Sequence, residues 1–387
     1  MAINNNFYAT INELVHDFTT NDIVASVVDY KTFVDAGRTL QQLSGTDLAN
    51  GFLTPLMNKV QLTIDTFRAY QSDLAEMYKG TTRGGVIEMI THLFYSARQA
   101  PFINLQNTND DSMIDFVKPE IRAKYYTDEN AYQFVISRTD TELRAAWDSP
   151  EAMDAFLQTI IGDIANSNEL GKEVSRLGLL GGAISEVLNN ANINSTTPKP
   201  TSQWVDLLGI YNTITGQTPA LTKQNALMDK DFVRWSVSFI NEFKQWMRKP
   251  SSSLNLGGVV TFTPLEAQRT KISADFDAAI RRSLWQLYNR DGAMLSDYEV
   301  LPYWGYQSEP GNVGVYVDGQ GSDLTGTVLA CVYDDYALGE YVNLESVTSE
   351  RNNKKLYTTY YWNGIRRYIR NDNANFVVFT LGNITGM

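Results

Sequence analysis

The chain has 387 residues, 43% of them hydrophobic, and its 44 acidic and 32 basic residues give a formal net charge of −12. This length and apolar content support a sizeable core and about two or three domains. The acidic balance argues against sequence-specific binding of DNA or RNA, and no apolar run is long enough for a membrane helix.

The first 45 residues alternate short apolar segments of helical character with polar breaks, and they lack the basic and apolar stretches of a secretory leader. Thr10 and Glu13 have the spacing of a capping box at the start of one such helix. We expect this region to be an arm that wraps around another surface. Helical spacing of apolar residues follows over residues 47–56, and strand-like alternation over residues 57–70.

A glycine-rich turn over residues 79–85 precedes two segments with strand character, residues 86–97 and 131–138. The residues between these two segments are largely polar. Because a structureless loop of this length is unusual in a compact domain, we expect an extended two-stranded excursion. Isolated two-stranded ribbons are only marginally stable in water, so this one should pack against a neighbouring surface.

The clearest helical signal follows Ser149 and Pro150, which suit the N-cap and the first helical position. Apolar residues then recur every three or four positions over residues 153–164, as expected for a helix with one buried face. The pattern resumes over residues 174–188, where three glycines predict a kink or a break, since each costs about 1 kcal/mol relative to alanine. These glycines are Gly178, Gly181 and Gly182. A polar linker over residues 189–202 follows.

The next block, which extends to about residue 347, mixes amphipathic helices with short strands. Helical spacing is present over residues 232–246 and 280–288. Strand patterns occur over residues 259–262, 298–301 and 326–329. Helices set against short strands indicate an α+β fold class, and no internal repeat extends through the chain.

The C-terminal segment over residues 356–380 is rich in aromatic and β-branched side chains, which predicts strands covered on both faces. Its aromatic residues are Tyr357, Tyr360, Tyr361, Trp362, Tyr368, Phe376 and Phe379. Asn363 and Gly364 permit either a tight hairpin turn or a bend in one long strand. The segment also contains Arg366, Arg367 and Arg370. For these arginines we favour charge pairs across strands or with an acidic neighbour over contacts with phosphates.

No group of residues has the spacing of a catalytic, cofactor or metal site, so we expect no enzyme activity, no cofactor and no bound metal. The single cysteine, Cys331, lies in a strand-like run and should be buried and inert. His16 and His92 are far apart in the sequence and are poor candidates for a metal site or a catalytic pair.

Two acidic patterns do not indicate a metal or catalytic site. Residues 318–323 combine aspartates with glycines, but they lack the glutamate that a calcium-binding EF-hand needs, so we expect a surface turn. The pairs Asp110-Asp111 and Asp334-Asp335 are adjacent, so on a strand they face opposite ways and cannot share a proton. We expect both pairs to be solvated charges.

The order of these elements, together with specific stretches of sequence, resembles a tailed-bacteriophage major capsid protein. The matching stretches are Asn-Gly-Phe-Leu-Thr-Pro-Leu at residues 50–56, the glycine-led strand at 85–90, the helix at 153–164, and the terminal segments at 355–362 and 374–379. The resemblance implies an α+β fold of the Hong Kong 97 type. The sequence is similar in particular to the capsid proteins of small podoviruses related to phage phi twenty-nine.

The resemblance also implies a division of the chain into parts. These are an N-terminal arm (1–45), the first part of a peripheral domain (46–84), an extension loop (85–147), the spine helix and linker of the peripheral domain (148–198), an axial domain (199–345) and return strands of the peripheral domain (346–387). The extension loop would overlap a neighbouring subunit, and the axial domain would pack around the centre of a capsomer. The C-terminal strands would complete the peripheral sheet beside the spine helix.

The function implied is that of a major capsid protein, which self-assembles into the icosahedral shell that encloses a double-stranded DNA genome. The implied partners are further copies of the chain in hexamers and pentamers, a scaffolding protein, a portal, and DNA bound without sequence specificity, with no membrane. The implied location is the virion, after synthesis in the cytoplasm of the bacterial host. Arg366, Arg367 and Arg370 then become candidates for contacts between subunits.

Two alternatives to this function remain open. The first is another phage-derived assembly protein, such as a tail component or an encapsulin-like shell. The second is an enzyme that uses carboxylates in an arrangement invisible to motif analysis.

Overall fold

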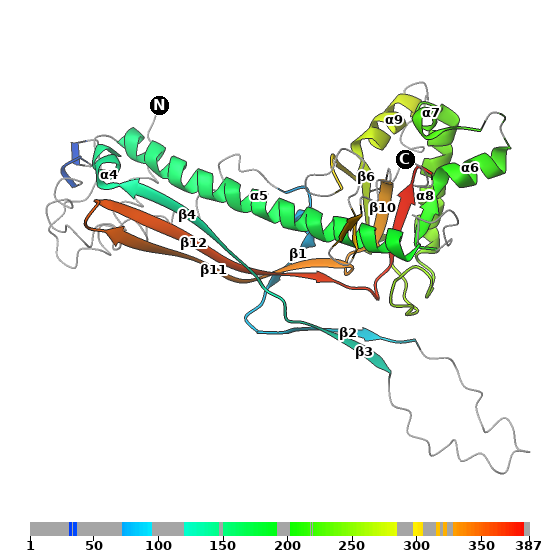
Figure 1. Ribbon diagram of the computed structural model, residues 1–387, viewed down its shortest axis with the longest axis horizontal. Coiled ribbons are helices and arrows are strands. Elements are labelled where there is room, and N and C mark those ends of the chain that lie inside the picture. Colours follow the sequence, from blue (N-terminus) through cyan, green and yellow to red (C-terminus); the bar gives the residue numbers. More distant parts are fainter. Residues whose placement is uncertain are drawn as a thin grey trace, which may run out of the picture.

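The computed structural model describes residues 31–32, 34–36, 72–94, 120–146, 150–191, 202–216, 218, 220–284, 297–304, 315–317, 320–322 and 328–382. Two β-sheets are joined by one long helix, and a two-stranded ribbon extends away from both sheets (Figure 1). Of the predicted arm, the structure describes helical residues 31–32 and 34–36. The segments predicted over residues 47–70 lie outside the described residues.

The long helix α5 (Pro150–Asn190) has 41 residues and runs along one sheet to the other (Figure 1). Its predicted start at Pro150 is confirmed. The kink or break predicted at the three glycines is wrong, because the helix is continuous there. Leu180, Ile184 and Leu188 on this stretch are fully buried. Each such side chain contributes about 1.5–3 kcal/mol on burial, which outweighs the roughly 1 kcal/mol cost of a glycine.

The four-stranded sheet has the order β1-β11-β12-β4. Its strands are β1 (Tyr78–Thr81), β11 (Leu338–Asn352), β12 (Tyr357–Arg370) and β4 (Asn130–Thr139). β12 pairs antiparallel with both β11 and β4 through Asn363 and Gly364, so one long strand is correct here and a hairpin turn is not. The strand predicted over residues 131–138 is confirmed, but its partner is β12 and not the segment at 86–97.

The five-stranded sheet has the order β5-β13-β10-β6-β7. Its strands are β5 (Trp204–Asp206), β13 (Phe376–Thr380), β10 (Val328–Asp334), β6 (Gln268–Ser273) and β7 (Glu299–Leu301). One face packs on residues from the C-terminal half of α5. The other face packs on α6 (Leu207–Thr215), α8 (Lys230–Trp246) and α9 (Ala274–Leu284). Both faces are therefore covered, and the predicted α+β class is confirmed.

The two C-terminal strands divide between the two sheets. β12 joins the sheet beside α5, whereas β13 joins the five-stranded sheet, so the expectation that both strands complete one sheet is wrong for β13. All five residues of β13 are buried, as predicted for a strand covered on both faces. On β12 the prediction fails for the face away from α5, where Tyr361, Asn363 and Ile365 keep part of their exposure.

The strand predicted over residues 259–262 is not formed. In its place the structure has a single bridge between Ser251 and Thr261. The side chain of Asn255 explains this difference, because it bonds both the backbone N–H and the carbonyl of Val259. A side chain that satisfies backbone groups competes with strand pairing.

The ribbon consists of β2 (Ile87–His92) and β3 (Ile121–Tyr126), which pair antiparallel. It confirms the predicted two-stranded excursion, although β3 was not recognised as its second strand. The remaining short elements are η3 (Ala75–Met77), α4 (Asp140–Ala146), α7 (Lys223–Ala226), η6 (Leu265–Ala267), β8 (Val315–Val317) and β9 (Gln320–Ser322).

Candidate functional site

Among the described residues, no group of three or more His, Cys, Asp or Glu side chains is placed to hold a metal ion. Cys331 is fully buried on β10, and this burial raises the pKa of its thiol to about 12, as expected for an inert cysteine. His92 lies on the ribbon, as predicted for a strand residue, and His16 lies outside the described residues. None of the helices described here combines the length and apolar character that a membrane crossing needs.

The expectation of solvated charge is wrong for Asp334, while Asp110 and Asp111 lie outside the described residues. Asp334 ends β10 and is buried, and it accepts hydrogen bonds from the Thr263 hydroxyl at 2.7 Å and the Tyr336 backbone N–H at 2.9 Å. Burial raises the pKa of Asp334. A buried carboxylate with these two hydrogen bonds stabilises the turn that follows β10.

Its neighbour Asp335 has a different environment, because it lies between two cations. Its Oδ1 is 2.9 Å from Lys79 Nζ and 2.9 Å from Arg269 Nε. Partial burial alone would raise the pKa of Asp335, but the hydrogen bonds and charges of Lys79 and Arg269 lower it overall. Within the turn predicted over residues 318–323, Gln320–Ser322 form the strand β9 instead, and residues 318, 319 and 323 lie outside the described residues.

The Arg366 guanidinium is buried between α5 and the four-stranded sheet, with 2% of its side chain exposed. It contacts Glu345 Oε1 at 2.6 Å and Glu340 Oε1 at 3.4 Å. Glu340 is fully buried and also pairs with Arg176 of α5 at 2.6 Å. The Arg366 guanidinium lies over the Tyr132 ring at 4.7 Å from the centroid. These contacts fasten α5 to β11, β12 and β4.

The other two arginines of the predicted cluster also pair with carboxylates of the same chain. Arg367 has 1% of its side chain exposed, pairs with Glu129, and donates to the Gly84 carbonyl at 2.8 Å. Arg370 pairs with Glu186 and, at 3.0 Å, with Asp372, and 32% of its side chain is exposed. The expected charge pairs are therefore present within the chain. The intersubunit role of the three arginines stays a prediction.

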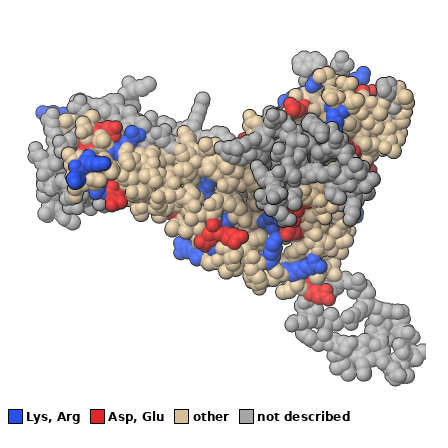
Figure 2. Space-filling view, in the orientation of Figure 1, with Lys and Arg blue, Asp and Glu red and all other residues tan. Residues whose placement is uncertain are grey.

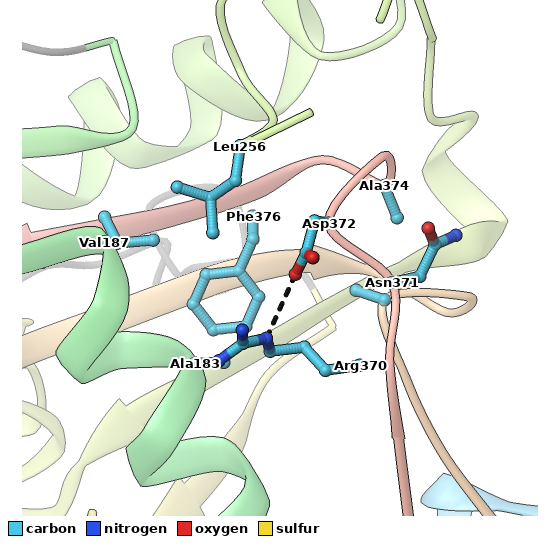
Figure 3. Close-up of a pocket in the computed structure, with 9 residues that line it drawn as sticks. Ala183, Val187, Leu256, Arg370, Asn371, Asp372, Ala374 and Phe376 are labelled. Carbon is cyan, nitrogen blue, oxygen red and sulfur yellow. Dashed lines mark hydrogen bonds and ion pairs between the residues drawn. The ribbon is translucent and has the colours of Figure 1, made fainter. Parts of the chain in front are cut away.

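The turn between β12 and β13 is a junction for several distant segments. Figure 3 shows Arg370 and Asp372 of this turn beside Ala183 and Val187 of α5, with Leu256 and Phe376 completing the pocket. Asp372 lies 2.6 Å from Lys124 of β3. This turn therefore connects the long helix, both sheets and the ribbon.

The inner face of the ribbon is attached to this junction by polar contacts. The Tyr126 hydroxyl donates to the Arg370 carbonyl at 2.5 Å, and Arg122 Nη1 donates to the Gly257 carbonyl at 2.7 Å. Asn373 Nδ2 donates to the Thr91 hydroxyl at 3.2 Å. Because these contacts all lie on one face, they orient the ribbon relative to the body.

The opposite face of the ribbon, which we call the outer ribbon face, is exposed. It consists of Glu88, Ile90, His92, Ile121, Ala123 and Tyr125. Tyr125 is 62% exposed, Ile121 51% and Ile90 45%. Large apolar side chains gathered on one exposed face are typical of an interaction surface.

The four-stranded sheet has several exposed residues on the side away from α5, and we call this side the open sheet face. It consists of Ala131, Gln133, Val135 and Ser137 of β4, Thr359, Tyr361, Asn363 and Ile365 of β12, and Leu344, Ser346, Thr348 and Glu350 of β11. Val135 and Leu344 are exposed. Gln133, Asn363 and Thr348 form a ladder across the strands, with hydrogen bonds of 2.6 Å and 3.1 Å.

On the other side of the same sheet, a groove of about 470 Å³ lies between α5 and β4. Phe134, Leu170 and Arg366 are among the residues that line it. Leu170 projects from α5 and is exposed. The sheet therefore has an open face and a groove on opposite sides, and the sequence indicated neither, because both depend on which strands pair.

Two solved structures are similar to this chain in fold. A chain in the capsid structure of Staphylococcus phage Andhra has 9% sequence identity and a TM-score of 0.53, and the match covers 82% of this chain and 86% of that one. A chain in the structure of the head fiber and inner core protein gp22 of native bacteriophage P68 has 11% identity and a TM-score of 0.54, with coverage of 81% and 86%. The shared fold is the phage capsid fold of the Hong Kong 97 type.

No curated protein matches the chain in sequence. A family model described as Phi29-like phage major capsid protein, in contrast, matches residues 9–380. This range includes both sheets, the long helix and the ribbon. The chain therefore belongs to the Phi29-like phage major capsid protein family and forms the shell of a phage particle.

Proposed function

We propose that this shell subunit assembles by overlap, with residues 85–147 acting as an extension loop that lies over a neighbouring subunit. The observation that carries this proposal is the ribbon of β2 and β3, which stands away from the body (Figure 1). Two-stranded ribbons are marginal in water unless they pack on something else. Its inner face is attached to its own chain, so the exposed outer ribbon face is the part left for a neighbour.

The remaining parts of the chain have complementary roles in this proposal. Residues 1–45 form an arm, residues 46–84 and 148–198 belong to the peripheral domain, and residues 199–345 form the axial domain around the capsomer centre. The five-stranded sheet suits the axial domain, and it takes β13 from the return segment at 346–387. The helix α5 suits the spine of the peripheral domain, because the four-stranded sheet packs along it.

The partners in this proposal are copies of the chain in hexamers and pentamers, a scaffolding protein, a portal and enclosed double-stranded DNA. The net charge of −12 supports enclosure without tight binding, because strong phosphate contacts need a basic face. As a major capsid protein the chain is located in the virion, and we place its synthesis in the cytoplasm of the bacterial host.

The subunit has a structural role in the capsid, and we propose that it carries out no catalysis. Membership of a shell-forming family supports this proposal. Of the three arginines proposed for contacts between subunits, Arg370 has the best support. Arg366 and Arg367 are almost completely buried by their own chain, whereas Arg370 keeps an exposed part.

The test is expression of the chain with and without a scaffolding partner, followed by negative-stain electron microscopy. Closed shells are expected from the wild-type chain. A variant in which a short Gly-Ser linker replaces residues 87–126 should still fold, so its circular dichroism spectrum should keep the signals of the helices and of the remaining strands. This variant should form no closed shells. Tubes or rings from the wild-type chain would favour a tail component, and a monomer with hydrolytic activity would favour an enzyme. Closed shells from the linker variant would contradict the overlap.

A further inference from the structure

We propose that the Asn363-Gly364 pair of β12 is a latent deamidation site, which the four-stranded sheet keeps unreactive and which reacts when this part of the sheet opens. Asn-Gly occurs at two places in the sequence, residues 50–51 and 363–364, and the second of these lies among the described residues. The reaction marks irreversibly the subunits whose sheet has opened and removes them from assembly. It is independent of how subunits overlap in the shell.

The reaction needs these two residues and water. The main-chain nitrogen of Gly364 attacks the side-chain carbonyl carbon of Asn363, the amide C–N bond breaks, and the proton of the attacking nitrogen leaves with the amide group as ammonia. Water then opens the cyclic succinimide at one of its two carbonyl groups. Opening at the side-chain carbonyl gives aspartate. Opening at the main-chain carbonyl gives isoaspartate, which lengthens the main chain by a methylene group.

The sheet itself requires a glycine after Asn363. A Cβ at residue 364 would clash with the Tyr132 ring of β4. The absence of a side chain is also what allows the main-chain nitrogen of residue 364 to approach the Asn363 carbonyl, because glycine has the widest backbone freedom. Packing against β4 therefore places the reactive pair in the middle of β12.

Pairing on both sides of β12 prevents the attack while the sheet is closed. Asn363 lies opposite Ser346 of β11 and Gln133 of β4, and Figure 1 shows β12 beside both strands. Its Oδ1 accepts from Gln133 Nε2 at 2.6 Å, and its Nδ2 donates to the Thr348 hydroxyl at 3.1 Å. Because the attack requires the side chain to fold back and Gly364 to leave its extended conformation, these bonds have to break first. The reaction therefore reports local opening of the sheet.

The site lies on the solvent side of the sheet. Asn363 is half-buried on the open sheet face, whereas its neighbours in sequence, Trp362 and Gly364, are buried. The helix α5 packs on the opposite side, where Arg366 donates to Asn168 of the helix at 3.0 Å. Water is therefore present to complete the reaction once the strands separate.

Isoaspartate at position 363 prevents the sheet from closing again in the same register. β12 pairs residue by residue with β4 from Tyr357 to Arg366, and with β11 on its other edge. An additional main-chain methylene in the middle of this strand offsets one half of it against both neighbours. Since a slip of one residue moves every side chain to the other face, a subunit with this product does not regain the native sheet.

Aspartate at position 363 has a milder effect. Its carboxylate still accepts hydrogen bonds from Gln133 and Thr348, but it adds a charge to a nearly neutral surface. The open sheet face contains one charged residue, Glu350. On the side drawn in Figure 2, a broad stretch of the elongated body likewise lacks charged side chains. In a subunit with a net charge of −12, a further carboxylate increases the repulsion between copies.

Peptide mass spectrometry of the full-length chain in mildly alkaline buffer tests the site. We would follow deamidation at Asn363 in folded subunits, in assembled shells and in the chain unfolded in urea. The unfolded chain should react at least about tenfold faster than the two folded forms, since an opening free energy of about 1.4 kcal/mol corresponds to a factor of ten. Equal rates in folded and unfolded chains, or no reaction in the unfolded chain, would overturn the proposal.

Substitutions at the two hydrogen-bond partners test whether the sheet controls the rate. Gln133→Ala and Thr348→Val each remove one bond to Asn363, and each should speed deamidation in folded subunits by about fivefold, which corresponds to about 1 kcal/mol. Ser137→Ala is the matched control, because it removes a hydrogen bond of 2.9 Å to Thr359 on the same strands and should leave the rate unchanged. An unchanged rate in the first two variants, or an equal increase in all three, would contradict the protective role of these bonds.

Labelling with protein isoaspartate methyltransferase measures the effect on assembly. After partial deamidation of free subunits, isoaspartate at position 363 should be severalfold rarer in shells than in the subunits that remain unassembled. Equal labelling of the two pools would show that the modified subunits still assemble, and that the reaction removes none of them.

Discussion

At the scale of single residues, close packing within the sheet makes some positions intolerant of change. Gly364 lies in the middle of β12, and the Tyr132 ring of β4 occupies the place where a Cβ would project. The same ring supports the Arg366 guanidinium. A tight hairpin turn would have used Gly364 for its backbone freedom. The long strand uses it to make room for an aromatic ring.

Gly364→Ala should therefore destabilise the subunit by about 1–3 kcal/mol, the usual cost of overpacking. Gly182→Ala is the matched control, because no atom lies near its side chain position and it is exposed on α5. It should stabilise the subunit by about 0.4–1 kcal/mol. The midpoint of urea unfolding measures both effects. Shifts of the same sign in the two variants would show that the Tyr132 contact does not matter.

Glu340 is a second residue whose role depends on burial. It lies between Arg176 and Arg366 with no exposed surface. Glu340→Gln removes the charge that both guanidinium groups need, so we expect a loss of about 3–5 kcal/mol in the free energy of unfolding. Glu345→Gln removes a partner of Arg366 that is more exposed, and should cost about 1 kcal/mol or less. Equal losses in the two variants would contradict this difference.

At the scale of elements, the ribbon is attached by polar contacts on one face, and such an attachment opens more easily than a buried apolar one. The ion pair of Lys124 with Asp372 is partly exposed and contributes about 1 kcal/mol or less. The hydrogen bond from Tyr126 to Arg370 adds about 1 kcal/mol. Local opening at such a site occurs below the free energy of global unfolding.

The double variant Lys124→Ala with Tyr126→Phe should free the ribbon without unfolding the body. Amides of β2 should exchange hydrogen about tenfold faster, since about 1.4 kcal/mol corresponds to a factor of ten. Amides of β13, which is buried in the five-stranded sheet, should keep their exchange rates. Glu88→Gln on the outer ribbon face is the control and should change neither rate. Faster exchange in β13 would mean that the ribbon and the core unfold together.

At the scale of the whole molecule, assembly has to overcome repulsion between subunits that each have a net charge of −12. Salt should therefore lower the critical concentration for assembly, because the screening length falls from about 30 Å at 0.01 M to about 8 Å at 0.15 M. Light scattering across this range measures the effect. An uncharged osmolyte at equal osmolarity is the control. A critical concentration that rises with salt would show that attraction between opposite charges dominates the contacts.

The sequence by itself determined the elements whose pattern is local. The start of α5 at Pro150, the helix α8 and the strands β7 and β10 all follow from periodicity and capping, which depend on neighbouring residues. The acidic net charge argues against sequence-specific binding of DNA or RNA. The order of elements also led to the capsid family, which the family model confirms.

The tertiary structure decided everything that depends on pairing between distant segments. The continuity of α5 through its glycines depends on side chains buried against the five-stranded sheet. The second strand of the ribbon, β3, and the separation of β12 from β13 depend on strand register, which no local pattern specifies. Burial of Arg366 and Arg367 has the same origin, because only the packing of α5 on the sheet removes these charges from water and supplies their carboxylate partners.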